Sequence, residues 1–484
     1  MIAQHSTLLS TIVRAHTGDS RFLYSDFPAT GLVVVTITCY GGVKEIGGNK
    51  ILIQDKDTKL FLDFGAGFSE GTQFFSAGIE PRRVNGAGDY FEFGLLPEIP
   101  GLYSEDALQN TELKYSKPDV DAILLSHFHY DHMGRINLVD PEIPVWCGET
   151  TSFMSQASSE SGGSPLDGHD IKTFRTGDRF RVGTVEVEPI HVDHSIPGAY
   201  GFILHTSEGA VAYTGDFRFH GPMGTMTEDF ASESAKAKPV ALLSEGTRVA
   251  KAERRREVSE VAVAREVTSI LKKNGGMVFS SFRGNDTDRI VSFYDACEST
   301  GRRLVVSMKV ALLLEQLGRD RRLKLPRVGR DVSVYVRRKG GGDYDDSDYY
   351  VWERKYLDDG LTAAEIRKKQ SSIFLHLDQW YFPELIDIRP SKGGAYVHAT
   401  TEAFNEEGEQ DEAAIRNWVD YFAFSYHQIH ASGHAPMDSV GELVSRIRAR
   451  RVIPIHTERP DLFPSIAKGS KVSLPSRGRA IPVQ

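Results

Sequence analysis

The sequence predicts an α/β protein, and three features of the chain support this. Short runs rich in β-branched residues are bounded by glycines between residues 31 and 65, which is typical of buried strands. Between residues 277 and 317, strand patterns alternate with helical patterns, an order that implies a parallel sheet with helices on its faces. With 484 residues, the chain is long enough for about three domains or for one large domain that carries an insertion. Its composition, 40% hydrophobic and 25% charged, is that of an ordinary globular protein.

The first half of the chain is predicted to consist mainly of strands. Three are expected in GLVVVTITCYGG, NKILIQD and TKLFLDFG, and the others are Val120–Leu125, Val185–Ile190, Tyr200–His205 and Gly209–Thr214. Residues 66–116 carry glycine and proline without a clear period, so they predict an irregular surface excursion over a site.

The second half is predicted to alternate. The expected elements are a helix over Ala252–Asn274, a strand over Met277–Ser281, a helix over Asp286–Ser299, a strand over Arg303–Ser307 and a helix over Lys309–Leu317. The acidic segments Gly340–Tyr350 and Thr401–Ala413 are predicted to be surface loops. A helix over Val440–Arg448 and the strand RVIPIH end the pattern.

Composition restricts the compartment and the partners. No stretch approaches the roughly eighteen apolar residues of a membrane span, so no membrane contact is expected. The first 22 residues lack the pattern of a secretory signal, and Cys39, Cys147 and Cys297 are far apart, which favours the cytoplasm. The net charge of −9 requires any nucleic-acid contact to be local. The basic clusters Arg254–Arg256, Arg319–Arg322 and Arg337–Lys339 are each interpreted as solvated faces.

The strongest chemical signal is the motif SHFHYDH at Ser126–His132, directly after a predicted buried strand. In an extended segment, side chains two residues apart share a face, so His127 and His129 can converge on one ion. If a helix begins near Asp131, the carboxylate of Asp131 and the imidazole of His132 turn away from that ion and toward the position of a second ion. Imidazole and carboxylate are the ligands of zinc and related divalent ions, so the motif predicts a metal site.

Four further ligand-type residues follow predicted strands, and they are Asp63, His194, Asp216 and His456. Taken alone, each aspartate is more typical of a capping residue, and each histidine of a packed residue with satisfied hydrogen bonds. Their shared position just after a strand, where loops carry function, predicts that together they complete the site.

This pattern resembles the metallo-β-lactamase fold over about residues 31–245. Members of that fold close the site with a histidine soon after the aspartate of the TGD motif, whereas here about 180 residues intervene before SGH at Ser432–His434 and PIHT at Pro454–Thr457. Such an insertion resembles the β-CASP subgroup, the RNase J-like and cleavage-factor-type nucleases. Glu245 in ALLSEGTR, His434 in SGHA and His456 in PIHTE match motifs of that subgroup.

The resemblance implies an αββα sandwich with an inserted β-CASP-type α/β domain. The segment DTDRIVSFYDACESTGRRLVVSMK is similar to the inserted domain, and GGVKEIGGNK to the opening hairpin of RNase J-like enzymes. The implied boundaries are 1–30 for an N-terminal extension, 31–245 and 428–484 for the hydrolase domain, and 246–427 for the inserted domain.

The resemblance also implies a role for each matched residue. One ion would take His127, His129 and His194, and the other Asp131, His132 and His456, with Asp216 bridging them. Two divalent ions, zinc or alternatively manganese, lower the pKa of a shared water and clamp the attacking and leaving oxygens. The other roles are Asp131 for orienting or deprotonating the water, Asp63 for fixing a ligand imidazole, His434 as general acid or phosphate contact, Ser432 and Gly433 as phosphate contacts, and Glu245 for positioning His434.

The predicted function is a two-metal phosphodiesterase that cleaves single-stranded RNA as an exonuclease, an endonuclease or both. One alternative is a hydrolase of a small ester, lactone, thioester or phosphodiester, which a narrowing loop at 66–116 would favour. Another is a DNA-directed nuclease, because no motif reads a 2′-hydroxyl. A non-catalytic binding subunit would have lost metal ligands, and none is missing. A homo-oligomer stays open.

The remaining histidines and aromatic runs have simpler interpretations. His191, His205, His220, His376 and His398 are interpreted as core or surface residues, and a supporting role for His430 stays open. The runs Trp380–Pro383 and Tyr421–Tyr426 are able to stack bases, although core packing is favoured.

Overall fold

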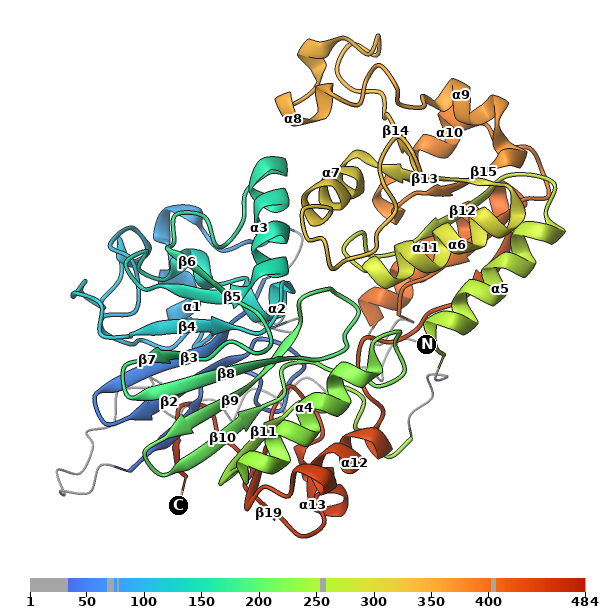
Figure 1. Ribbon diagram of the computed structural model, residues 1–484. Coiled ribbons are helices and arrows are strands. Elements are labelled where there is room, and N and C mark those ends of the chain that lie inside the picture. Colours follow the sequence, from blue (N-terminus) through green and yellow to red (C-terminus); the bar gives the residue numbers. More distant parts are fainter. Residues whose placement is uncertain (1–33, 68–73, 76–77, 253–257, 402–405, 484) are drawn as a thin grey trace, which may run out of the picture.

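The computed structural model describes residues 34–67, 74–75, 78–252, 258–401 and 406–483. The predicted N-terminal extension, residues 1–30, and the basic cluster Arg254–Arg256 lie outside these ranges. The described chain forms two facing sheets and a third, separate sheet (Figure 1). Along these ranges, no helix combines the length and apolar character that a membrane span needs.

Two seven-stranded sheets form the body of the sandwich. The first contains, in spatial order, β20 (Ala480–Pro482), β1 (Thr36–Cys39), β2 (Lys50–Asp55), β3 (Thr58–Phe64), β4 (Ala122–Leu125), β5 (Val145–Gly148) and β6 (Ile171–Phe174). The second contains β19 (Lys471–Val472), β18 (Arg451–Pro454), β11 (Ala241–Ser244), β10 (Gly209–Tyr213), β9 (Tyr200–Thr206), β8 (Val185–His191) and β7 (Phe180–Val182). Their inner faces share one apolar core that includes Leu62, Phe202 and Ile453.

Helices cover the outer faces of both sheets. The first sheet carries α1 (Gly88–Glu92), α2 (Tyr130–Met133) and α3 (Glu149–Ser161), and the second carries α4 (Gly224–Ala237), α12 (Met437–Ile447) and α13 (Phe463–Ile466). The predicted αββα sandwich is therefore confirmed. Seven single-turn 3-10 helices in the described chain are η1 (Arg83–Asn85), η2 (Asp106–Leu108), η3 (Ile136–Leu138), η4 (Asp346–Asp348), η5 (Gln370–Ser372), η6 (Gln379–Tyr381) and η7 (Pro460–Leu462).

The third sheet is parallel throughout, as the alternating pattern predicted. Its order is β14 (Ser333–Tyr335), β13 (Arg303–Ser307), β15 (Ile373–His376), β12 (Val278–Ser281), β16 (Ala395–His398) and β17 (Ser425–Gln428). One face packs on α5 (Glu260–Lys273), α6 (Thr287–Thr300) and α7 (Met308–Leu317), and the other on α9 (Ala363–Lys368), α10 (Glu384–Ile388) and α11 (Glu406–Tyr421). The short helix α8 (Val351–Arg354) lies beyond β14.

Side-chain caps fix where the three helices on the first of these faces begin. Ser259 accepts from the backbone N–H of Ala262 at the start of α5, Asp286 caps α6, and Ser307 caps α7. Such caps satisfy backbone donors that the first helical turn leaves unpaired. The predicted helix over Ala252–Asn274 is therefore too long at its start, because α5 begins only after the Ser259 cap.

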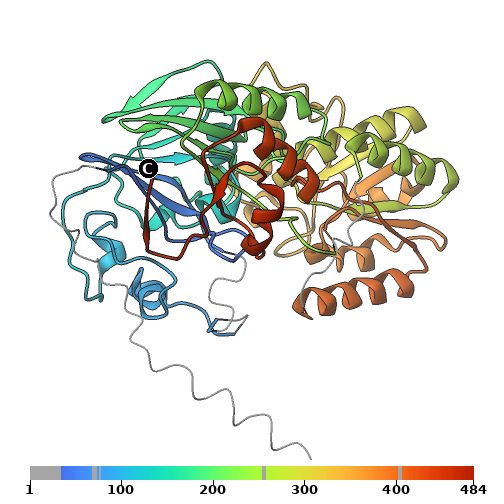
Figure 2. The ribbon, with the colours of Figure 1, turned by 90° about the horizontal axis from the view of Figure 1, so that it is seen from below.

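After the third sheet the chain returns to the sandwich and completes both of its sheets. Strand β18 pairs in parallel with β11, and β20 pairs with β1. Helix α12 packs beside α4, and Figure 2 shows the red C-terminal segment against the green strands and helix. Strands β12–β17 lie within residues 278–428, and the boundaries expected for the inserted domain stay a prediction.

Two predicted loops differ from the structure. The segment Thr401–Ala413 was expected to be a loop, but its described part from residue 406 belongs to α11, which buries Ile415 and Val419 one helical turn apart. The excursion at 66–116 is not only a surface feature, since Leu96, Leu102 and Leu108 pack in the core beside the first sheet.

Arg289 ties the third sheet to the returning chain. Its guanidinium is fully buried and donates to both carboxylate oxygens of Glu260, at 2.9 and 3.2 Å. It also donates to the carbonyls of Ala399 at 2.6 Å and Ala431 at 3.3 Å. The residues that carry SGHA are thus fixed against α6.

Replacing Arg289 with alanine would leave the buried carboxylate of Glu260 without its counter-charge. We expect Arg289→Ala to lower the free energy of unfolding by about 3–5 kcal/mol, as is usual when one member of a buried ion pair is removed. Urea denaturation measures this effect, with Arg265→Ala on the exposed side of α5 as the control. Equal stability of the two variants would contradict the assignment.

Candidate metal centre

The turn after β4 places the SHFHYDH motif at an edge of the sandwich. His129 is extended and α2 begins at Tyr130, close to the predicted start, so Asp131 and His132 turn away from the preceding histidines. Gly65 makes this turn possible, because a Cβ atom there would lie 1.7 Å from the carbonyl oxygen of Asp131. The backbone of β3 can therefore pass directly against the motif.

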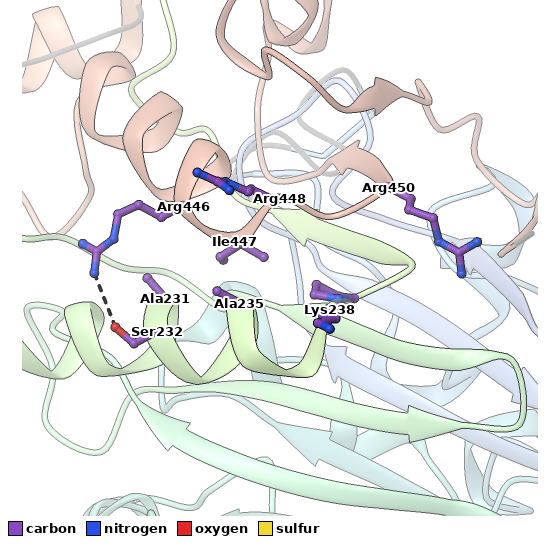
Figure 3. Close-up of a pocket in the computed structure, with 9 residues that line it drawn as sticks. Ala231, Ser232, Ala235, Lys238, Arg446, Ile447, Arg448 and Arg450 are labelled. Carbon is purple, nitrogen blue, oxygen red and sulfur yellow. Dashed lines mark hydrogen bonds between the residues drawn. The ribbon is translucent and has the colours of Figure 1, made fainter.

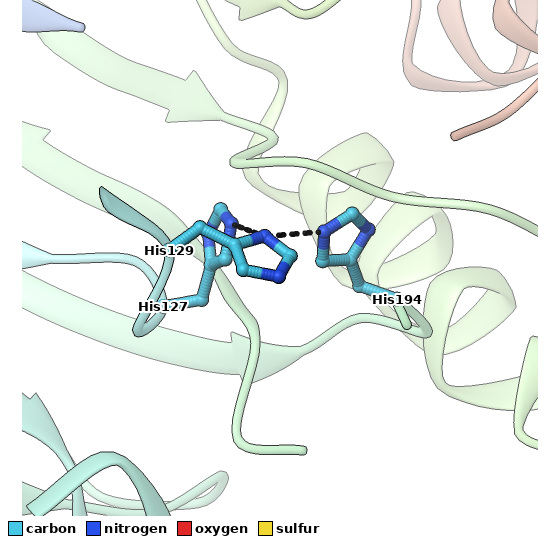
Figure 4. Close-up of side chains that lie close together, drawn as sticks. All are labelled: His127, His129 and His194. Atoms are coloured by element: carbon cyan, nitrogen blue, oxygen red, sulfur yellow. Dashed lines mark hydrogen bonds between the residues drawn. The ribbon is translucent and has the colours of Figure 1, made fainter. Parts of the chain in front are cut away.

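Three imidazoles converge at one side of this edge (Figure 4). The Nε2 atoms of His127 and His194 lie 3.0 and 3.2 Å from Nδ1 of His129. Burial holds the pKa of His127 and His194 well below the usual value and lowers the pKa of His129 to about 3. These rings are neutral at pH 7, so their converging lone pairs suit a cation.

Two contacts orient these rings. The carbonyl oxygen of Gly433 lies 2.5 Å from Nδ1 of His194 and accepts a hydrogen bond from it, which leaves Nε2 for the shared centre. Nδ1 of His127 lies 3.0 Å from Oγ of Ser126. A Cβ atom at position 433 would lie 2.8 Å from the ring of His194, so glycine is required for this approach.

A second group contains Asp131, His132, Asp216 and His456, all buried. Nε2 of His132 lies 3.1 Å from Oδ2 of Asp216, and Nε2 of His456 lies 3.0 Å from Oδ2 of Asp131. Burial opposes charge on both rings, but the carboxylates outweigh it: the pKa of His132 is held well above its usual value, and the pKa of His456 is raised to about 9. Burial likewise opposes the charge on Asp131 and Asp216, yet the imidazoles lower the pKa of both acids.

Asp216 lies between the two groups. Its Oδ2 is 3.7 Å from Nε2 of His127 and 3.6 Å from Nε2 of His456. Its Oδ1 is buried and has no hydrogen-bond partner among the described residues. A buried carboxylate oxygen without a donor fits a site that holds a cation.

Asp63 supports the centre from behind. Its carboxylate accepts from the backbone N–H and hydroxyl of Ser126, at 2.7 and 2.8 Å, and from the hydroxyl of Tyr213 at 2.5 Å. It also lies 2.7 Å from Nδ1 of His132. Asp63 and His456 have backbone φ values of 58° and 50°, which non-glycine residues seldom adopt and which are typical of functional positions.

His434 lies at the open side of the centre, with its side chain 22% exposed. Its Nδ1 is 3.1 Å from Oε1 of Glu245 and 3.8 Å from Oδ2 of Asp216. Glu245 is fully buried and also accepts from the backbone N–H groups of Phe217 and Thr247. Glu245 therefore contacts His434 and the backbone beside Asp216, and it is not accessible to a ligand in front of the site.

The Ser432–Gly433 turn is held by two residues that sequence reasoning did not assign to the site. Arg218 Nη1 donates to the carbonyl oxygen of Ser432 at 3.1 Å, and Nε2 of His220 lies 2.9 Å from the same oxygen. Fully buried Arg218 also pairs with Asp193, next to His194, and with Asp288 on α6. The only sequence signal was the position of Arg218, two residues after Asp216.

The structure brings every predicted site residue to this edge. The strands β3, β4, β8, β10, β11 and β18 all end there, and the matched residues follow them. The donor set suits divalent metal ions. Asp216 can also be grouped with His194 and His434, so the division of ligands between ions stays a prediction.

Known proteins with similar sequences were found for most of the chain. Residues 99–276 match the family model described as β-lactamase superfamily domain. The chain is 25% identical to ribonuclease J of Sinorhizobium meliloti over 394 residues, covering 78% of this chain and 65% of that protein. It is 22% identical to ribonuclease J 2 of Streptococcus pyogenes, covering 88% of this chain and 70% of that protein. The chain thus spans about two thirds of the length of these relatives.

The chain has a metallo-β-lactamase fold, and its sequence resembles those of ribonucleases J. A crystal structure of a protein of unknown function from Enterococcus faecalis V583 shares the fold with a TM-score of 0.71. It is 20% identical and covers 93% of this chain and 100% of that one. The fold is therefore common to nearly the whole chain and not confined to the sandwich.

The two groups of imidazoles should differ in proton release when a metal binds. Without metal at pH 7, His132 and His456 carry protons, because their pKa values are raised, whereas His127, His129 and His194 do not. We expect Zn²⁺ binding to the group with His456 to release about one to two protons and to tighten as pH rises toward 9. Calorimetric titration in two buffers of different ionisation enthalpy measures this release.

The variants His456→Ala and His194→Ala separate the groups in this titration. The first should lower the proton release, and the second should leave it unchanged while weakening the other binding event. Binding heats that do not depend on the buffer would contradict the raised pKa values.

Proposed function

We propose that this protein is a metal-dependent ribonuclease. The observation that carries the proposal is the convergence of His127, His129, His194 and the group around Asp216 at one buried edge. Similarity to ribonucleases J along most of the chain supports a nucleic-acid phosphodiester as the substrate.

Two divalent ions fit the residues, with zinc preferred and manganese as the alternative. His127, His129 and His194 would hold one, Asp131, His132 and His456 the other, and Asp216 would contact both. When bound, such ions lower the pKa of a shared water and stabilise the charge of an in-line displacement. Asp131 would orient the water. Asp63 would orient the imidazole of His132 through its contact with Nδ1.

His434 would contact the phosphate or protonate the leaving oxygen. Its imidazole is partly exposed, as is that of His129, and Glu245 fixes its Nδ1, which leaves Nε2 for contact with a bound substrate. Oγ of Ser432 accepts from the backbone N–H of His434 at 3.1 Å, and its own hydroxyl proton can be donated to a phosphate oxygen. The backbone at Gly433 completes this phosphate contact.

The alternative substrates have less support. A small ester or lactone was favoured by a loop narrowing the site, but Leu96, Leu102 and Leu108 of the segment 66–116 pack in the core beside the first sheet. DNA differs from RNA by a hydroxyl that no assigned residue reads, so DNA is an outcome of the test. Cytoplasmic location, a homo-oligomer, and exonucleolytic or endonucleolytic cleavage stay predictions.

Cleavage of end-labelled single-stranded RNA and matched DNA tests the proposal directly. We expect Zn²⁺- or Mn²⁺-loaded protein to cleave RNA, and Asp131→Ala and His132→Ala each to lower the rate at least about a hundredfold, because they remove ligands and water orientation. His205→Ala, a half-exposed histidine on β9, is the control that should keep full activity. The product ladder gives the polarity, and metal-loaded protein that cleaves neither strand would overturn the proposal.

His434 should affect catalysis without affecting metal binding. We expect His434→Ala to lower kcat by about a hundredfold, the range of a lost general acid, with the metal content unchanged. Glu245→Gln should lower kcat less, because an amide oxygen can still accept from Nδ1 of His434. Loss of metal from His434→Ala, measured by elemental analysis, would instead make His434 a ligand.

A further inference from the structure

A cavity of about 510 Å³ lies between the end of α3 and the third sheet. One wall is formed by residues 159–162 of the sandwich, and the other by residues that follow β13, β14 and β15. The candidate metal ligands do not line it. The cavity is therefore a separate feature of the molecule.

The topology of the third sheet favours ligand binding at this place. From β13 the chain passes through α7 to β14 at the edge of the sheet, whereas from β15 it passes through α10 to β16, beyond β12. Open parallel sheets bind ligands outside the carboxyl ends of their strands, where the connections diverge in this way. Ser307 at the end of β13 and His376 at the end of β15 both line the cavity.

The charge of the cavity suits an anion. Lys309 and Arg337 line it, and neither forms an ion pair with any residue in the described ranges. Lys339 is neutralised by Glu353, 2.6 Å away, and Glu160 is the other acid of the wall. Helix α7, ten residues long, also begins at the cavity and directs its positive end there.

Aromatic rings stand beside these cations. Tyr350, Trp352 and Tyr381 line the cavity, and Tyr350 is 70% exposed. The guanidinium of Arg337 lies 4.1 Å from the centre of the Tyr381 ring. An aromatic ring next to a cation suits a single nucleotide, because the base can stack on the ring and the phosphate can pair with the cation. Arg337 and Lys339 are thus not merely a solvated face, as the sequence had suggested.

His376 adds a specific requirement. It is 4% exposed, and its Nε2 lies 3.1 Å from the carbonyl oxygen of Phe282, to which it donates. Its Nδ1 is then an acceptor, and this atom is buried without a partner among the described residues. Burial also lowers the pKa of His376 to about 4, so the ring stays neutral. A ligand that donates a hydrogen bond from a hydroxyl or amino group would satisfy it.

We propose that this cavity binds a single nucleotide unit, which combines a phosphate for Lys309 and Arg337, a base for the aromatic rings and a donor for His376. The unit is either a free mononucleotide or one nucleotide of a bound strand, since the two share this chemistry. The proposal does not depend on the reaction at the metal centre.

A second cavity provides a matched control (Figure 3). It lies between α4 and α12 and is lined by Lys238, Arg446, Arg448 and Arg450, with a volume of about 620 Å³. It has the cations but no aromatic lining, and it lies on the second sheet of the sandwich. Replacing Arg450 removes the same charge as replacing Arg337 without touching the proposed site.

The experiment measures binding of two probes to the full chain with metals removed by chelation. The probes are adenosine monophosphate and a 5′-labelled single-stranded RNA oligonucleotide, and the variants are Arg337→Ala, Lys309→Ala and Arg450→Ala. Both Arg337 and Lys309 are at least partly exposed, so the variants should fold, which thermal unfolding checks. Adenosine without phosphate serves as a further probe of the anion contact.

We expect Arg337→Ala and Lys309→Ala each to weaken binding about tenfold, and Arg450→Ala to leave it unchanged. Weakening of the mononucleotide alone identifies a free nucleotide as the ligand, and weakening of the oligonucleotide identifies a nucleotide of the strand. The proposal is overturned when both cavity variants bind both probes as tightly as the unaltered protein. Because no cleavage is measured, this result is independent of the proposed ribonuclease activity.

Discussion

The buried carboxylate of Asp63 is the contact on which the metal centre depends. It links β3 to the turn after β4 through Ser126, and it links the first sheet to the second through Tyr213. The Tyr213 hydroxyl also accepts from Nδ2 of Asn49 at 3.1 Å. Because Asp63 also holds Nδ1 of His132, the spacing of the two sheets and the direction of that imidazole are set by one group. The left-handed backbone of Asp63 costs free energy, and the four hydrogen bonds of its carboxylate, to the backbone and hydroxyl of Ser126, to Tyr213 and to His132, offset this cost.

Arg218 makes the insertion part of the site. One guanidinium contacts Asp193 beside His194, Asp288 on α6 and the carbonyl of Ser432. A shift of α6 would therefore displace both Asp193, next to His194, and the turn that carries His434. Arg289 fixes the same helix to Ala431, one residue before that turn. Buried arginines with several acceptors are stiff links, since each lost contact leaves a charge without compensation.

The sequence was informative wherever chemistry is local. The motif at Ser126–His132 carries four ligand-type residues in one turn, and strand ends placed Asp63, Asp216 and His456 at the same edge. Contacts between distant segments were not predictable in this way: Arg218 and His376 had no distinguishing pattern in the sequence. Arg337 and Tyr381 lie in a basic cluster and an aromatic run that the sequence does show, but their pairing is visible only in the structure. Helix α11 was missed because its acidic start concealed an apolar side that repeats only from Ile415 onward.

The two imidazole groups are both neutral without metal, but for different reasons, so binding of an ion changes their net charge differently. Asp131 and Asp216 are ionised beside protonated His132 and His456, so that group is neutral before any metal binds. Exchange of two protons for a divalent ion there leaves the buried charge unchanged. His127, His129 and His194 are already neutral, so an ion among them adds its full charge to a buried place. If an ion binds there, an anionic substrate such as the phosphodiester proposed above would supply the missing negative charge, and it would bind at the open side near His434.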